Sequence, residues 1–88
     1  MSKRTSLMVA YDLLQVAIGG STKTKLVYQG NLNFNIIKRW LAKLIAKGLL
    51  EFTPTPTNTW KTTLKGVDFM RAMEKTMFFW DDGTMEVI

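Results

Sequence analysis

The sequence predicts a mainly helical fold with one small β-hairpin. Apolar residues recur at three- and four-residue steps in several segments, which is the spacing of helices that bury one face. Glycines separate these segments, and a loop rich in threonine and proline separates two short apolar runs. With 88 residues, 47% of them hydrophobic and 22% charged, the chain 1–88 is expected to form a single globular domain.

Residues 5–18 form the first predicted helix. Thr5 or Ser6 can cap its start, and Gly19-Gly20 ends it because glycine tolerates the left-handed backbone that follows many helices. Its apolar stripe is wide, so we expect the helix to be well buried. The stripe consists of Leu7, Val9, Ala10, Leu13, Leu14, Val16 and Ala17.

The second predicted helix covers residues 22–29. Ser21 or Thr22 can cap it, and Gly30-Asn31 breaks it. Its aromatic residue, Tyr28, could stack on a base of a single strand, but such a residue beside leucine and valine is more often part of the core. We therefore expect Tyr28 to be buried.

The third predicted helix, residues 34–47, has two distinct faces. Asn33 caps it and Gly48 ends it. At about 100° per residue, the apolar residues gather on one side and small or polar residues on the other. The core side is expected to hold Phe34, Ile37, Trp40, Leu41, Leu44 and Ile45. The opposite side holds Asn35, Arg39, Ala42, Lys43 and Ala46, and Ile36 fits neither side.

Two short strands, 49–52 and 60–62, and a last helix, 64–80, complete the prediction. The loop 53–59 carries two prolines, which suit a hairpin tip, and Trp60 is expected in the core although it too could stack on a base. Thr63 can cap the last helix, and a short tail, 81–88, follows it.

This order of elements is that of a winged helix-turn-helix. A glycine turn joins the second and third helices, so the third is the expected recognition helix and segment 53–60 is the expected wing. The charge agrees with an anionic partner, because residues 21–65 hold eight basic residues and one acid, Glu51. Basic residues on a surface helix are also typical of an ordinary solvated face, and from charge alone both interpretations stay open.

The sequence therefore predicts contacts to double-stranded DNA through three segments. Arginine and asparagine on the outer face of helix 34–47 suit base edges in the major groove, and lysines suit phosphates. The wing 53–60 is expected on the adjacent backbone or minor groove. The candidate DNA-binding residues are Lys23, Lys25, Asn33, Asn35, Lys38, Arg39, Lys43, Asn58 and Lys61.

Several motifs between residues 21 and 70 resemble the archaeal winged helix-turn-helix family of small, basic DNA-binding proteins of Sulfolobus-type organisms. The motifs are Lys23–Tyr28 (KTKLVY), Gly30–Asn33 (GNLN), Trp40-Leu41, Lys47–Leu50 (KGLL) and Thr63–Gly66 (TLKG). The resemblance implies a homodimer that binds double-stranded DNA, in a cellular, plasmid or viral setting. It also implies a long coiled coil from the last helix, which we do not expect here because the sequence ends soon after Trp80.

The crowded apolar end of helix 64–80 predicts a homodimer interface. The candidate interface residues are Met70, Met73, Met77, Phe78 and Trp80. The alternative is that these side chains fold back onto the first helix. A further alternative for the whole protein is a protein–protein interaction module that uses this same apolar helix.

No residue pattern indicates an enzyme, a cofactor, a metal site or a small-molecule substrate. The chain has no histidine and no cysteine, and it contains no phosphate-binding glycine loop. Asp81-Asp82 with Glu86 is typical of a solvated helix end. No segment reads as an export signal or a membrane span, so an intracellular, nucleoid-associated location in the cytoplasm is expected.

Overall fold

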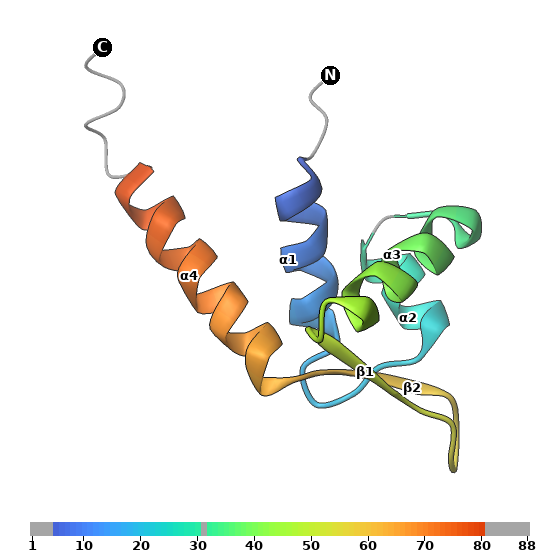
Figure 1. The fold of residues 1–88 in the computed structure, drawn as a ribbon. Coiled ribbons are helices and arrows are strands. Elements are labelled where there is room, and N and C mark those ends of the chain that lie inside the picture. The colour runs from blue at the N-terminus through green and yellow to red at the C-terminus, as the bar shows by residue number, and fades with distance from the viewer. Residues whose placement is uncertain (1–4, 31, 81–88) are drawn as a thin grey trace.

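The computed structural model describes residues 5–30 and 32–80, with side chains through residue 76. The elements are α1 (Ser6–Val16), α2 (Lys23–Gly30), α3 (Phe34–Ala46), β1 (Leu50–Thr53), β2 (Thr59–Thr62) and α4 (Leu64–Trp80). This confirms the predicted fold class, a mainly helical winged helix-turn-helix with one hairpin (Figure 1). The predicted tail, 81–88, lies outside the described residues.

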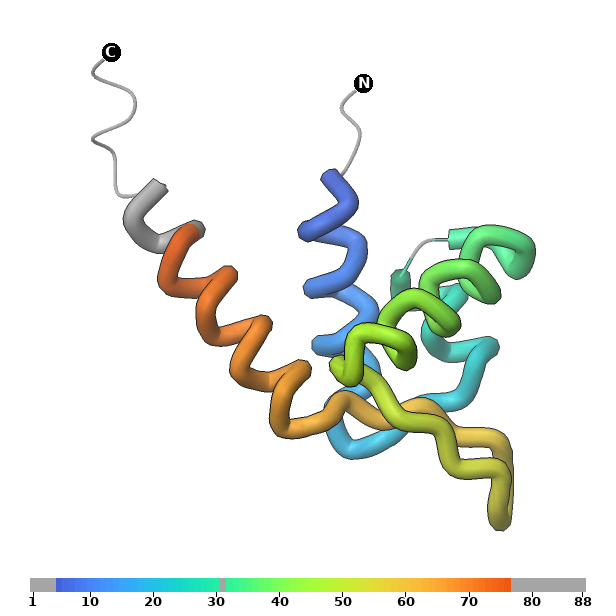
Figure 2. The backbone as a smooth tube through the Cα atoms, viewed as in Figure 1, coloured from blue at the N-terminus to red at the C-terminus, as the bar shows by residue number. Residues whose placement is uncertain are grey.

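Helix α1 stands at the centre of the fold (Figure 2). Helices α2 and α3 pack on one side of it, the hairpin projects from their base, and α4 leans away from α1 on the other side. Among the described residues, the largest fully buried side chains join α1 to the helix-turn-helix, namely Leu13, Leu14, Leu26, Ile37 and Leu44. The rest of the core comes from the hairpin and α4, through Leu50, Trp60 and Met70, so Trp60 is buried as predicted.

Each of the four helices in the described part of the chain begins at a side-chain cap. In each case the cap oxygen accepts a hydrogen bond from the backbone N–H three residues later, at distances of 2.8–3.3 Å. The caps are Thr5, Thr22, Asn33 and Thr63. Asn33 and Thr63 are the predicted caps, and at the two ambiguous starts the threonine rather than the serine caps the helix.

Ser21 has a different role, which the sequence did not indicate. Its backbone pairs with that of Trp60 in an isolated antiparallel bridge, with both N–H···O distances at 2.8 Å. Thr62 adds a buried bond from its hydroxyl to the carbonyl of Leu14, at 2.6 Å. The hairpin is therefore attached by its second strand to the end of α1 and to the segment before α2.

On α1 and α2, two side chains predicted in the core are exposed. Tyr28 on α2 is 88% exposed because it lies two residues from Leu26, and residues two apart on a helix face different directions. Leu7 on α1 is 57% exposed because α1 and α4 diverge toward that end of α1 (Figure 1). The helix pattern placed Leu7 on an apolar stripe, whereas Tyr28 was expected in the core because it lies beside leucine and valine. An apolar segment is buried only where another element covers it.

Gly66 lets α4 approach the hairpin closely. A Cβ at this position would lie 2.3 Å from the carbonyl oxygen of Leu49 and 2.7 Å from the methyl group of Thr62. Only a residue without a side chain fits between this backbone and the first turn of α4. Gly66 therefore sets how α4 leaves the domain.

Candidate nucleic-acid interface

The buried residues of α3 determine which of its side chains face outward. Ile37, Leu41 and Leu44 are at most 4% exposed and hold the helix against the core. Because these three residues point inward, Asn35 and Arg39 point into solvent on the opposite side, as predicted. The small residues Ala42 and Ala46 share that exposed face, so a groove-shaped partner could approach the helix closely.

The core side of α3 is narrower than predicted. Phe34 is 53% exposed and Ile45 is 40% exposed, so the expectation that both lie in the core is wrong. Both lie beside the buried stripe of the helix, and neighbouring elements cover them only in part. Ile36, which fitted neither side of the helical pattern, is 40% exposed.

A shallow hollow joins α3 to α2 and the hairpin. Its volume is about 280 Å³, and it is lined by Lys23, Lys38, Leu41, Ala42, Ile45, Phe52 and Trp60. The fold thus brings two predicted lysines, Lys23 and Lys38, from different helices to one depression beside the outer face of α3. An anionic backbone lying along α3 would meet both cations.

Phe52 belongs to this surface, and the sequence analysis did not name it. Its ring lies 4.8 Å from that of Trp60, centroid to centroid, and it remains 42% exposed. Phe52 pairs with Trp60 in the hairpin, and Leu50 lies two residues before it on the same face of the strand. That two-residue alternation is the signal that could have placed Phe52 toward α3.

Lys61 lies on the other face of the hairpin. It pairs with Glu51, whereas Phe52 and Trp60 form the next pair, and successive pairs in a ladder point to opposite faces. Lys61 is therefore turned away from the hollow and faces a carboxylate across the strands. The structure separates this predicted contact from Lys23 and Lys38.

Lys43 also departs from the predicted grouping. Its ammonium nitrogen lies over the ring of Trp40, 5.3 Å from the centroid, on the flank of α3 that faces α1 and α4. The oxygen of Asn33 is occupied by the cap of α3, while Lys25 on α2 and Asn58 in the wing are exposed. The predicted DNA-binding residues therefore fall into two groups. One lies at the outer face of α3 and the hollow beside it, and the other is spread over the surrounding elements.

Electrostatics favour an anionic partner at the helix-turn-helix. Helices α2 and α3 carry five basic residues and no acidic residue. The basic residues are Lys23, Lys25, Lys38, Arg39 and Lys43. A surface of one sign attracts polyanions over a distance of about a Debye length.

The candidate dimer residues are only partly described. Met70 is 4% exposed and belongs to the core, so little of it is left for a partner, whereas Met73 is half-buried. The side chains of Met77, Phe78 and Trp80 lie outside the described residues. Other apolar side chains are exposed on these two helices, namely Leu7 and Met8 on α1 and Leu64 at the start of α4.

The described residues include no group of three or more acidic residues placed to hold a metal ion. In that same part of the chain, no helix combines the length and the apolar character needed to cross a bilayer.

Comparison with known proteins agrees with this geometry. Residues 3–78 match the model of a family described as winged helix-turn-helix. The fold is similar to that of Sso10a-2, a DNA-binding protein from Sulfolobus solfataricus, with a TM-score of 0.80 and 18% identity over 90% of this chain and 84% of that one. A search of curated proteins found no match.

Proposed function

The chain belongs to the winged helix-turn-helix family, and from that premise we propose that it binds double-stranded DNA without catalysing a reaction. One observation carries the proposal. The α2–α3 pair has no acidic residue and presents Arg39 and Asn35 outward, beside a hollow lined by Lys23 and Lys38. The similar fold of a protein described as DNA-binding supports the same function.

In the proposed complex α3 lies in the major groove. Arg39 pairs with a guanine edge and Asn35 with an adenine edge, because their planar groups match those donor and acceptor patterns. Ala42 and Ala46 allow the helix backbone to approach the bases. The wing tip, which includes Asn58, contacts the adjacent backbone or minor groove.

The lysines hold the phosphates on either side of that groove. Lys23 and Lys38 are placed to contact the strand that passes the hollow, and Lys25 extends this contact along α2. Lys43 and Lys61 lie on the flanks and contribute to the general attraction. The protein would act as a transcriptional regulator or a chromatin-type protein, associated with the nucleoid.

We also propose that the protein acts as a homodimer through α4. Met8 on α1 and Leu64 at the start of α4 are 44% and 86% exposed, and together with the apolar residues predicted along α4 they support a contact with a second subunit. A two-fold pair would present two α3 helices to half-sites about one helical turn of DNA apart.

The experiment is a fluorescence anisotropy titration of a labelled random-sequence duplex at several salt concentrations. Binding that weakens steeply with salt is expected, because each phosphate contact releases a counterion. Selection of a preferred sequence would then separate a regulator from a chromatin-type protein. Absence of binding at low salt would refute the proposal.

A protein–protein interaction module is the second candidate function. The exposed apolar residues near α4 favour it, because they offer a contact surface that does not involve the basic face. Binding to a protein that persists at high salt, with no DNA binding at low salt, would support this function instead.

A further inference from the structure

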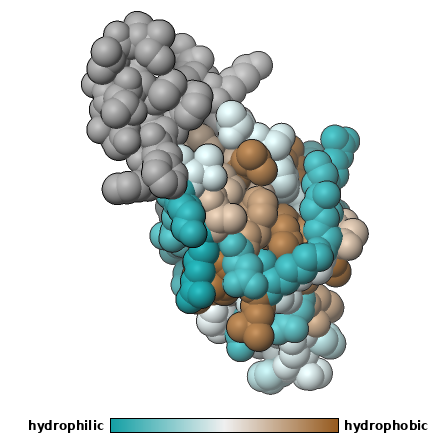
Figure 3. Space-filling model, turned by 60° about the vertical axis from the view of Figure 1, so that its left-hand side comes forward, coloured by the Kyte–Doolittle hydropathy of each residue, from teal (hydrophilic) through white to brown (hydrophobic). Residues whose placement is uncertain are grey.

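A groove between α1, α3 and α4 has the composition of a small-molecule site. Its volume is about 550 Å³, within the range of roughly 300–1,000 Å³ of ligand pockets. Buried Ala10, Leu44 and Leu49 form its floor. Figure 3 shows hydrophobic side chains open between hydrophilic ones when the molecule is viewed from the α4 side.

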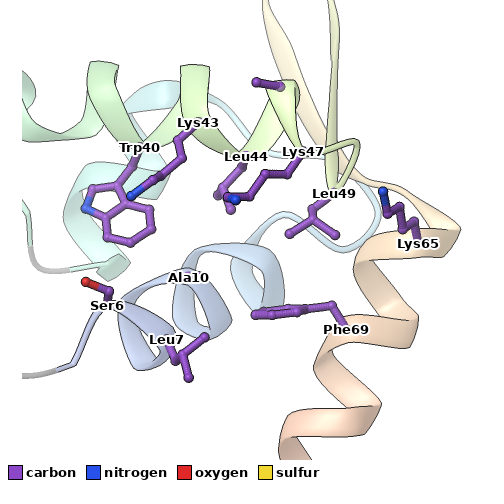
Figure 4. A pocket seen from close by; sticks show the side chains of 11 residues that line it. Ser6, Leu7, Ala10, Trp40, Lys43, Leu44, Lys47, Leu49, Lys65 and Phe69 are labelled. Carbon is purple, nitrogen blue, oxygen red and sulfur yellow. The ribbon is translucent and has the colours of Figure 1, made fainter.

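The walls of the groove come from elements far apart in the sequence. Figure 4 shows Trp40 and Leu44 directed from α3 toward α1, while the ring of Phe69 reaches from α4 toward α1, where Leu7 also lies. Trp40 and Phe69 are half-buried, and Leu7 is 57% exposed. These side chains form the open walls above the floor.

Cations alone form the charged part of this groove. Three lysines line it, Lys43, Lys47 and Lys65, and no acidic residue is among its lining residues. Lys65 is held over the end of α3, with its nitrogen 3.6 Å from the position that a Cβ on Gly48 would occupy. Lys43 lies over the ring of Trp40, so its charge is directed to the same side (Figure 4).

We propose that this groove binds a small amphiphilic anion, with an apolar body on the floor and a carboxylate or similar group between Lys47 and Lys65. Apolar walls with a few convergent polar groups are the usual composition of such sites. A nucleic-acid phosphate would satisfy the lysines but leave the apolar floor exposed to water. The ligand class is therefore a soluble anion with an aliphatic or aromatic body.

The test is a titration of decanoate into the full chain without DNA, monitored by ¹H–¹⁵N correlation spectra. Decanoate is expected to shift the signals of Leu7, Leu44 and the Trp40 indole in a saturable, one-to-one manner. Decyltrimethylammonium, with the same tail and the opposite charge, and acetate, with the same charge and no tail, are expected not to. Equal binding of both amphiphiles, or the same shifts with acetate, would overturn the proposal.

Variants locate the site. Lys65→Gln and Lys47→Gln are each expected to weaken decanoate binding about three- to fivefold, and Lys75→Gln on the far part of α4 to leave it unchanged. Leu7→Glu should abolish binding, because it places a carboxylate on the wall. Ile18→Glu is the matched control, since Ile18 is 54% exposed and does not line the groove. Equal effects of the paired variants would overturn the assignment.

The occupant could instead be a second copy of the chain. Sedimentation in the presence and absence of decanoate distinguishes the two occupants. If the apparent decanoate affinity fell as the protein concentration rose, the groove would be covered by self-association. That result would overturn the proposal. Because decanoate is titrated without DNA, the result is independent of whether the protein binds DNA.

Discussion

The hydroxyl of Tyr11 on α1 donates a hydrogen bond to the carboxylate of Glu74 on α4, with an O···O distance of 2.5 Å. The two residues are 63 positions apart in the sequence, and their contact joins α1 to α4. This bond raises the pKa of Tyr11 above its usual value, with smaller contributions from desolvation and from the charges of Glu74 and Asp12. Because this bond joins α1 to α4, the packing of α4 on α1 is linked to the protonation state of Tyr11.

This contact predicts a pH dependence. Because the folded pKa of Tyr11 is raised above the unfolded value of 10.0, the stability from the contact is present below pH 10.0 and is lost as the pH rises through the folded pKa. Glu74→Ala should lower the Tyr11 pKa toward 10.0. The measurement is tyrosinate absorbance in a Tyr28→Phe background, where Tyr11 is the sole tyrosine. An unchanged titration curve would show that the contact does not form in solution.

Arg39→Ala should change the sequence preference of DNA binding. We expect a loss of about 1–3 kcal/mol at the preferred site and little loss on random sequence, because a guanine contact carries specificity. Anisotropy titrations on selected and scrambled duplexes measure both. If Arg39→Ala bound every duplex like the wild type, the placement of α3 in the major groove would be wrong.

Lys23→Ala should weaken binding to all sequences and reduce the salt slope by about one, because one phosphate contact is lost. Lys75→Ala is the control, since this exposed lysine lies on α4, away from the hollow. The logarithm of the affinity against the logarithm of salt concentration gives the slope. Equal slopes for the two variants would argue that Lys23 does not face the DNA.

Gly66→Ala should destabilise the domain by about 3 kcal/mol or more, because the new Cβ meets backbone that cannot move freely. Gly19→Ala is the comparison, since its φ of +82° is costly for alanine but no atom lies within 4 Å of the Cβ position. That variant should cost only about 1–2 kcal/mol. Denaturant unfolding measures both, and the reverse order would contradict the close approach of α4 to the hairpin.

Met73→Glu should shift the proposed homodimer toward monomer, because it puts a charge on a half-buried position of α4. Sedimentation equilibrium over a range of protein concentrations measures the change, with Ile18→Glu as a control of equal new charge. Circular dichroism confirms that the variant folds. A wild-type protein that stays monomeric throughout would refute the dimer.

Local rules determined much of this protein. Apolar spacing, threonine and asparagine caps and glycine stops depend on residues within one turn of each other. The order of elements, the caps Asn33 and Thr63, and the exposed positions of Asn35 and Arg39 therefore follow from the sequence itself. The same holds for the concentration of positive charge in α2 and α3.

Only the tertiary structure decided which apolar surfaces are covered and which cations meet. The exposure of Tyr28 and Phe34 depends on where neighbouring elements end, which no helical pattern contains. Strand register turned Lys61 toward Glu51, while the packing of α2 beside α3 brought Lys23 to Lys38. The physical reason is that burial and charge proximity are set by contacts between distant segments, and the divergence of α4 from α1 left open a groove that no single segment specifies.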